Sequence, residues 1–425
     1  MSLLRSLYQL PINAFFALSQ DRLKAKYTEG NDERQGEIPS EKLAQLSGAR
    51  PVWVHAVSVG EVQAAVPFIK AARADGYKGP VVLSTTTQTG KAMAERLGGG
   101  LFDLHIYYPW DKKRFVALAL DTLRPELFVT AETELWPNML WECRERAIPA
   151  FLINGRISDR TWGRISGGIA KHAAASLYSL FSELYLRDEE DARRLSEVGV
   201  RAEKLHVLGD SKIDALLARK NTAARDGWRE KFGAPERPIF IAGSTHTGED
   251  EKVIAAFELL RGSRPEARLI IAPRHPERAE AVASLVPEKY KTMRLSALAE
   301  GWDVLIIDKI GVLFDLYGTA YSAFVGGSFA DKGGQNILEP FSWGVPVQYG
   351  PHMEDFAQAS RAFILMGAAA QVADERELAE VWRCLAAERD TGERWQRLSR
   401  DYFEKSCGAS MRTWQMIKKY LSGYG

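Results

Sequence analysis

The chain has 425 residues, 46% of them hydrophobic and 26% charged, and its formal net charge is +1. This length exceeds what one hydrophobic core supports and predicts two domains, and the near-neutral charge excludes a global field that would attract nucleic acid. The three cysteines are odd in number and lack metal-ligand spacing, so we expect no disulfide framework. The seven histidines are scattered, and we predict no metal ligands.

The N-terminal stretch, residues 1–18, is apolar but interrupted by polar residues and by Pro11. No small-residue cleavage site follows it, and no apolar run of the chain reaches about 18 residues, so we expect neither a secretory signal nor a spanning helix. Residues 1–26 carry four basic side chains and one acidic one, a net charge of +3. This pattern predicts that residues 1–28 associate with a membrane; the alternative is a helix packed on the protein's own surface.

Short apolar runs alternate with helical patterns through the first half of the chain. Residues 29–48 are polar and predict a loop leading into a short helix. We predict strands over 51–57, 80–86, 127–130 and 150–153, and helices over 61–74, 89–97 and 138–146. Such alternation indicates βαβ units and a parallel sheet, in which ligands bind beyond the carboxyl ends of the strands.

The end of the first predicted strand carries Ser58, Gly60 and Glu61. The glycine permits a sharp turn, and Glu61 then opens a helix. Its carboxylate is either a general base directed toward a ligand or a first-turn residue that complements the helix dipole.

The next two strand ends are also polar. Thr86 lies in a hydroxyl-rich turn that either binds a sugar or phosphate or caps a helix. Glu132 and Glu134 stand two residues apart beside Trp136, and they are either acceptor-binding groups or part of a solvated capping box.

In the second half, strands are predicted over 239–242, 269–272, 304–307 and 322–325. Ser244 follows the first of these, and Arg274 and His275 follow the second. The guanidinium of Arg274 has the fork geometry for bidentate phosphate contact. Lys212, which precedes the predicted linker, is a further candidate cation.

The strand at 322–325 ends in Gly326, Gly327 and Ser328, and a helix is expected to open near Asn336. Exposed N–H groups and the positive end of a helix dipole suit a phosphate, and Glu339 could accept ribose hydroxyls. The alternative is an ordinary strand–turn–helix unit. Neither a Walker A nor a Gly-x-Gly-x-x-Gly pattern is present.

Taken together, these strand ends resemble the 3-deoxy-D-manno-octulosonic acid (Kdo) transferases of lipopolysaccharide synthesis. The resemblance runs in order from about residue 50 to 360 and rests on Ser58–Glu61, Thr86–Gly90, Tyr108–Asp111, Glu132–Asn138, Asn154–Ser158, Gly243–His246, Pro273–Arg278, Gly326–Ser328, Leu338–Pro340 and Gly350–His352.

The resemblance implies an α/β protein with the GT-B fold, in which the parallel sheets of two Rossmann-like domains face a central cleft. We expect a membrane-associating segment over 1–28, an acceptor-binding domain over 29–215, a linker over 216–236, a nucleotide-sugar-binding domain over 237–400 and a C-terminal helix over 401–425.

The implied reaction is an inverting transfer of Kdo from CMP-Kdo to a lipid A precursor (lipid IVA), with no cofactor and no nucleotide-bound metal. The implied general base is Glu61. The acceptor-side candidates are Ser58, Gly60, Thr86, Glu132 and Glu134, and the donor-side candidates are Lys212, Ser244, Arg274, His275, Gly326, Gly327, Ser328, Gln335, Asn336 and Glu339. The implied location is the cytoplasmic face of a Gram-negative inner membrane, on an anionic surface, as a peripheral or monotopic protein without a nucleic-acid partner.

Two residues depart from the family pattern in the donor half. Gln335 stands where the family usually has histidine, and Val312 where it tends to have glutamate. They leave open another GT-B transferase or a nucleotide-sugar epimerase that uses a different nucleotide sugar, and a catalytically inactive relative.

Overall fold

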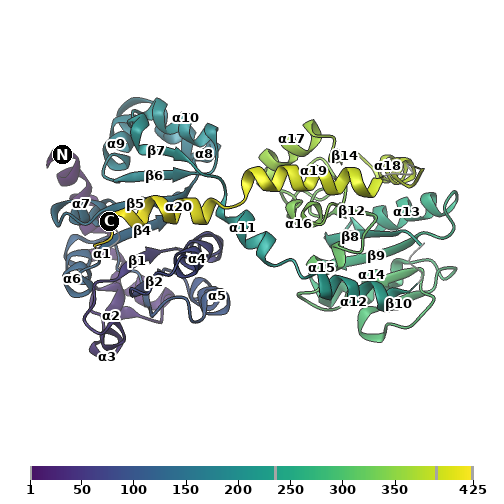
Figure 1. Cartoon of the computed structure of the whole chain (residues 1–425), viewed down its shortest axis with the longest axis horizontal. Helices are drawn as coiled ribbons and strands as arrows, with labels where there is room; N and C mark the ends of the chain where they lie inside the picture. Colours follow the sequence, from purple (N-terminus) through teal and green to yellow (C-terminus); the bar gives the residue numbers. More distant parts are fainter. Residues whose placement is uncertain (1, 234–236, 388–390, 423–425) are drawn as a thin grey trace. The chain divides into compact units, whose positions relative to one another are not determined.

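A computed structural model describes residues 2–233, 237–387 and 391–422, and the chain divides into two compact units (Figure 1). The first comprises residues 1–215 and 406–425, and the second residues 216–405. The predicted linker, 216–236, thus falls within the second unit, where α12 (Thr222–Phe232) lies; residues 234–236 are outside the described part. The predicted C-terminal helix is two helices, α19 (Thr391–Ser406) and α20 (Ala409–Ile417).

The first unit is built on a seven-stranded parallel sheet in the order β3-β2-β1-β4-β5-β6-β7. Its strands are β1 (Val52–His55), β2 (Val81–Thr85), β3 (Leu104–Tyr107), β4 (Leu127–Ala131), β5 (Ala150–Gly155), β6 (Glu183–Leu186) and β7 (Leu205–Val207). Every residue of β1, β2, β4 and β5 is buried, as expected for parallel strands covered on both faces.

Helices cover both faces of this sheet. One face packs against α6 (Lys113–Leu123), α7 (Pro137–Glu145), α9 (Gly168–Tyr178) and α10 (Glu189–Val198). The other packs against α4 (Val59–Ala74), α5 (Gln88–Gly98) and α20, whose Trp414 donates a hydrogen bond to Asp75 at 2.9 Å. Shorter helices α2 (Asn31–Arg34), α3 (Ser40–Leu43) and α8 (Asp159–Ile165) complete the unit, and α11 (Ser211–Ala218) leads out of it.

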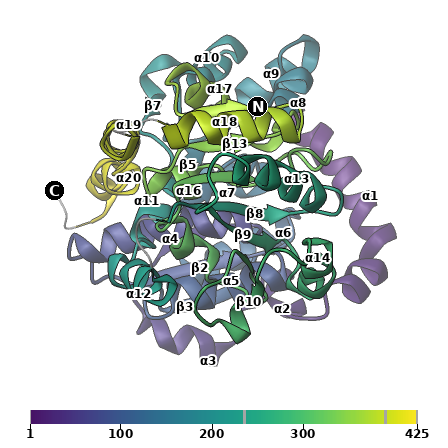
Figure 2. The ribbon, with the colours of Figure 1, turned by 90° about the vertical axis from the view of Figure 1, so that its right-hand side faces the viewer.

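The second unit repeats this plan with a parallel sheet in the order β10-β11-β9-β8-β12-β13-β14. Its strands are β8 (Ile239–Thr245), β9 (Arg268–Pro273), β10 (Thr292–Arg294), β11 (Val304–Ile306), β12 (Ser322–Val325), β13 (Val347–Tyr349) and β14 (Ala369–Gln371). Figure 2 shows α13 (Asp250–Arg261), α14 (Ala279–Leu285) and α18 (Glu375–Ala387) against it, where they share one buried core. The remaining helices are α15 (Leu313–Tyr317), α16 (Leu338–Ser342) and α17 (Ala357–Leu365).

The prediction of two Rossmann-like α/β domains is confirmed. The predicted loop over 29–48 is wrong in part, because it holds two short helices and the buried Glu33 and Arg34. Arg34 lies over the rings of Tyr107 and Trp110, so a polar sequence conceals a packed segment.

The N-terminal stretch forms one helix, α1 (Ser2–Lys26), that packs on the first unit. Tyr8 donates a hydrogen bond to Asp111 at 2.8 Å, and Phe16 is buried against Trp110 and Phe115. Its other side leaves apolar residues exposed, up to 87% for Leu18. Within the described residues, no helix has both the length and the apolar character needed to cross a membrane.

Candidate active site

The site in the first unit is organised by Glu61 at the start of α4. Ser58 precedes the helix in extended conformation, and both its backbone N–H and its hydroxyl donate to Oε2 of Glu61, at 2.5 and 2.6 Å. The carboxylate is 9% exposed. Two short hydrogen bonds to one oxygen fix the orientation of the carboxylate, and the predicted position of Glu61 at the end of β1 is confirmed.

Two further acidic residues come to the same place from the turn after β4. The backbone of Glu132 is in the left-handed region, with φ of 61°, which a non-glycine residue rarely adopts. Its carboxylate forms an ion pair with Lys212 of α11. A side-chain carbon added to Gly60 would lie 3.8 Å from the Lys212 ammonium and 3.9 Å from the Ser58 hydroxyl, so these groups converge.

Glu134 completes this cluster. The pKa of the Glu134 carboxyl is raised to about 7. Burial is the largest cause, and the nearby carboxylates of Glu61 and Glu132 also raise it. Near neutral pH the Glu134 carboxyl is therefore present in both its protonated and its ionised form. The structure thus brings together five residues that the sequence predicted on the acceptor side: Ser58, Gly60, Glu61, Glu132 and Glu134. Lys212, which was predicted on the donor side, lies in the same cluster in the first unit.

Thr86 lies at the end of β2, next to the end of β1, since its N–H donates to the Val57 carbonyl at 3.2 Å. Its hydroxyl is buried without a partner among the described residues. Its carbonyl accepts a hydrogen bond from the buried Arg34 at 2.8 Å. The sequence did not indicate that Arg34 is buried, because the aromatic rings that cover it, those of Tyr107 and Trp110, lie more than 70 positions further along the chain.

The start of α7 is held by a residue outside that helix. Asp111 accepts hydrogen bonds from the N–H groups of Asn138 and Met139, both at 3.1 Å, and burial raises its pKa to about 6. The ring of Trp136 lies 5.1 Å from that of Tyr108. The motifs at 108–111 and 132–138 therefore support each other, which fixes the turn that carries the two glutamates.

In the second unit, the glycine turn after β12 holds a carboxylate of the protein itself. Glu249 is completely buried at the start of α13. Its carboxylate accepts N–H hydrogen bonds from His246, Gly327, Ser328, Phe329 and Ala330, at 2.7 to 3.2 Å. The N–H of Gly326 donates instead to Gly243 in the sheet.

The prediction that N–H groups of Gly326, Gly327 and Ser328 bind a phosphate is therefore wrong for this structure. An anion-binding turn is present, as the glycines indicated, but Glu249 occupies it. The sequence signal for the Glu249 contact was the carboxylate three residues after His246. The glycine turn that it binds lies about 80 residues further along the chain, so the contact could not be predicted from the sequence.

The helix expected near Asn336 is the five-residue α16, and Asn336 accepts a hydrogen bond from the Leu338 N–H at 3.0 Å. Glu339 forms an ion pair with Arg219 at 2.9 Å. The side chain of Gln335 lies over Gly327, within 3.3 Å of where a side-chain carbon there would be.

Ser244 lies near the carboxyl end of β8, and Arg274 and His275 follow β9 at the same edge of the second sheet. Ser244 has φ of 57°, and the Arg274 backbone N–H donates to Thr245 at 2.9 Å. The side chains of Arg274 and His275 are exposed. Their roles remain predictions.

One group of possible metal ligands exists among the described residues. Asp331, His352 and Glu354 bring ligand atoms within 4.8 Å of one another at the surface of the second unit. The sequence did not indicate it, because Asp331 is about 20 residues from the other two.

Comparison with known proteins agrees with this architecture. A putative UDP-N-acetylglucosamine 2-epimerase from Listeria monocytogenes matches over 88% of this chain and 97% of its own, with a TM-score of 0.59 and 13% identity. At that identity the match shows the fold alone. Two parallel sheets of this plan and these neighbours define the GT-B fold.

Sequence relatives narrow the class to a family. A family model described as 3-deoxy-D-manno-octulosonic-acid transferase (kdotransferase) matches residues 29–215. The 3-deoxy-D-manno-octulosonic acid transferase of Haemophilus influenzae is 32% identical over 382 residues, 87% of each chain. That of Bordetella pertussis is 33% identical over 389 residues, 88% of each. The chain therefore belongs to the 3-deoxy-D-manno-octulosonic acid transferase family and is a glycosyltransferase.

Proposed function

We propose that this enzyme transfers Kdo from CMP-Kdo to a lipid A precursor with inversion at the anomeric carbon, and that Glu61 is the general base. Membership of the transferase family supports the reaction. The observation that carries the role of Glu61 is its carboxylate, which Ser58 holds at the carboxyl end of β1 beside Glu132, Glu134 and Lys212.

The chemical step needs one proton acceptor. The acceptor hydroxyl gives its proton to the Glu61 carboxylate while its oxygen forms a bond to the anomeric carbon of Kdo. The bond from that carbon to the phosphate of CMP breaks on the opposite face, and CMP leaves with the electron pair. The two hydrogen bonds from Ser58 hold the Glu61 carboxylate in one orientation, as a base requires.

The neighbouring groups orient the acceptor. Lys212 neutralises Glu132, so the two together bring little net charge to the site. Glu134, with its pKa near 7, donates a hydrogen bond when protonated and accepts one when ionised. A sugar hydroxyl can use either form.

On the donor side, we propose Arg274 for the leaving phosphate or the Kdo carboxylate and Glu339 for the ribose. Arg274 is a cation whose side chain is exposed. A cation next to a leaving phosphate stabilises the charge that develops there, and we propose that it acts in place of a nucleotide-bound metal.

The test is CMP release from CMP-Kdo, measured with and without a lipid A precursor. We expect acceptor-dependent release by the intact protein, no release in Glu61→Ala, and no effect of a metal chelator. The absence of release from correctly folded intact protein, or release from a UDP-sugar instead, would contradict the proposed donor. Inhibition by the chelator would direct attention to Asp331, His352 and Glu354.

We further propose that α1 lies on the anionic cytoplasmic surface of the inner membrane. Its exposed apolar residues are Leu7, Leu10, Phe15 and Leu18. A helix that packs on the protein with one side and presents apolar side chains on the other suits a membrane interface.

Vesicle sedimentation tests this location. We expect Leu10→Ser/Leu18→Ser to weaken binding to anionic vesicles without lowering the melting temperature. The matched control is Leu259→Ser/Leu285→Ser, which replaces exposed leucines of the second unit. Equal partitioning of both double variants would contradict the assignment.

A further inference from the structure

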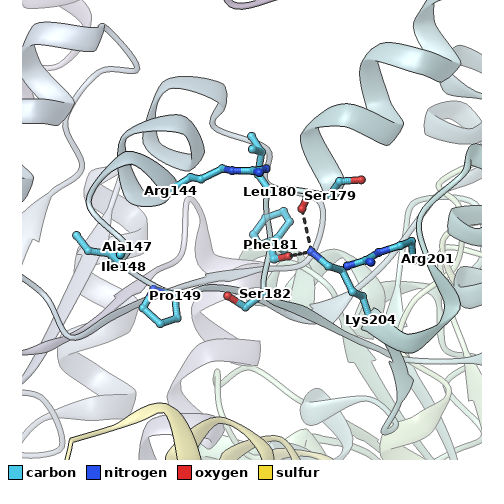
Figure 3. A pocket seen from close by; sticks show the side chains of 10 residues that line it. All are labelled: Arg144, Ala147, Ile148, Pro149, Ser179, Leu180, Phe181, Ser182, Arg201 and Lys204. Atoms are coloured by element: carbon cyan, nitrogen blue, oxygen red, sulfur yellow. Dashed lines mark hydrogen bonds between the residues drawn. The ribbon is translucent and has the colours of Figure 1, made fainter. Parts of the chain in front are cut away.

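A pocket lies at the edge of the first sheet opposite to the catalytic cluster. Its residues come from the segments just before β5, β6 and β7, at the amino ends of these strands. Its volume is about 490 Å³. Figure 3 shows the charged ends of Arg144 and Arg201 directed inward from opposite sides, with Lys204 between them. None of the residues that line it is acidic.

The ammonium of Lys204 is fixed in place. It donates to the carbonyls of Ser179 and Phe181, at 2.9 and 2.5 Å. An ammonium has three donors, so one remains for a ligand. The structure therefore holds a cation in position through two neutral carbonyl groups.

The side chains of Arg144 and Arg201 are accessible to solvent, and their positive charges are weakly neutralised by neighbouring carboxylates. The side chain of Arg144 is exposed at the surface. Arg201 pairs at 3.2 Å with Glu203, and both side chains are more than 60% exposed. Such a surface pair contributes little and exchanges readily with solvent or a competing anion.

The charges of the pocket act on one another. Burial lowers the pKa of Lys204, and the positive charges of Arg201 and Arg144 lower it further. The binding of an anion among the three cations would reduce the electrostatic repulsion between them.

We propose that this pocket binds a phosphate or diphosphate group of a larger molecule. Two guanidinium forks and an ammonium match the several oxygens and double charge of a phosphate better than the single charge of a carboxylate. The hydroxyl of Ser182 adds a polar group, and Leu180 and Pro149 give the pocket an apolar wall for the rest of the molecule. Its volume exceeds that of a phosphate alone.

The phosphate can come from a soluble molecule or from a lipid headgroup. Arg144 is next to Glu145, which forms an ion pair with Arg5 of α1. The helix that carries Arg144, α7, therefore contacts the helix that we propose to lie on the membrane. The site itself does not depend on the proposed reaction.

The first experiment is a titration of the full-length protein with inorganic pyrophosphate. We expect saturable binding that Arg144→Gln/Arg201→Gln weakens at least tenfold. The control, Lys70→Gln/Lys78→Gln, removes the same charge from exposed positions on α4 and the following loop and should bind as the intact protein does. Lys204 is left unchanged, because it also holds two carbonyls of the fold.

The second experiment identifies the source of the phosphate with phosphatidylcholine vesicles that contain or lack phosphatidic acid. A loss of phosphatidic acid binding in the arginine variant beyond that in the control assigns the pocket to a lipid headgroup. Unchanged vesicle binding together with weakened pyrophosphate binding assigns it to a soluble molecule. The proposal is overturned if the intact protein binds neither probe saturably, or if both double variants are affected equally.

Discussion

Glu61 and Glu249 follow the first strand of their respective units, and each accepts the backbone N–H of the residue three positions before it. Beyond this shared turn their surroundings differ. Glu249 is buried and accepts four more N–H groups from residues 327–330. Glu61 accepts one hydroxyl and lies beside two other glutamates. The same local motif thus makes a structural clamp in one unit and a candidate base in the other, and the distant neighbours decide which.

The largest expected effect is on the rate of Glu61→Gln. The amide cannot take the proton of the acceptor, so acceptor-dependent CMP release should fall on the order of 10²- to 10⁴-fold. The melting temperature should change little, because glutamine still accepts from Ser58. Glu95→Gln, an exposed substitution on α5, is the control and should retain the full rate.

Glu249→Gln should show the reverse pattern. The glutamine amide presents N–H groups to a site built of N–H donors, and each donor left unpaired costs about 1–3 kcal/mol of the free energy of unfolding. Thermal unfolding should begin at a clearly lower temperature than in the control Glu251→Gln, an exposed neighbour on the same helix. A melting temperature equal to that of the control would show that the clamp is not structural.

Glu134→Gln should change how stability depends on pH. In the native protein the pKa of Glu134 is about 7, against an ordinary value of 4.5, so the native state retains a proton that the unfolded chain releases. The stability of the intact protein should therefore fall as pH rises from about 4.5 to about 7, by on the order of 3 kcal/mol from this residue.

The variant lacks this titration, so its stability relative to the intact protein should grow over the same interval. Denaturant unfolding at several pH values measures the difference. A difference that stays constant between pH 4.5 and 8 would contradict the assignment of this pKa.

Ser58→Ala should have the smallest effect. It removes the hydroxyl donor to Glu61 and leaves the backbone N–H, with a loss of about 1 kcal/mol of stability as for other N-cap residues. The rate should fall by roughly tenfold or less, in line with one lost hydrogen bond. Ser158→Ala, which removes the cap of α8, should cost similar stability and leave the rate unchanged.

The comparison also shows what could be predicted from the sequence. The α/β plan and the position of Glu61 followed from contacts between residues close in sequence: a buried strand, a serine, a glycine and a glutamate. Short or half-exposed strands such as β7, β10 and β14 lacked a strong apolar pattern and were missed.

Contacts between distant segments could not be predicted. Lys212 pairs with Glu132 across 80 positions, which placed it in the first unit rather than with the donor-side residues. Glu249 reaches the glycine turn across a similar distance, and the glycines alone could not show that their anion is a side chain. In both cases the residue types indicated a charged or anion-binding site, but the sequence did not show which residues they contact.

The most direct test of the central claim measures acceptor-dependent CMP release and CMP binding for Glu61→Gln and Glu249→Gln side by side. We predict that Glu61→Gln binds CMP as the intact protein does and loses turnover, whereas Glu249→Gln loses stability and retains turnover at saturating CMP-Kdo. Turnover by Glu61→Gln at the rate of the intact protein would show that another group takes the proton.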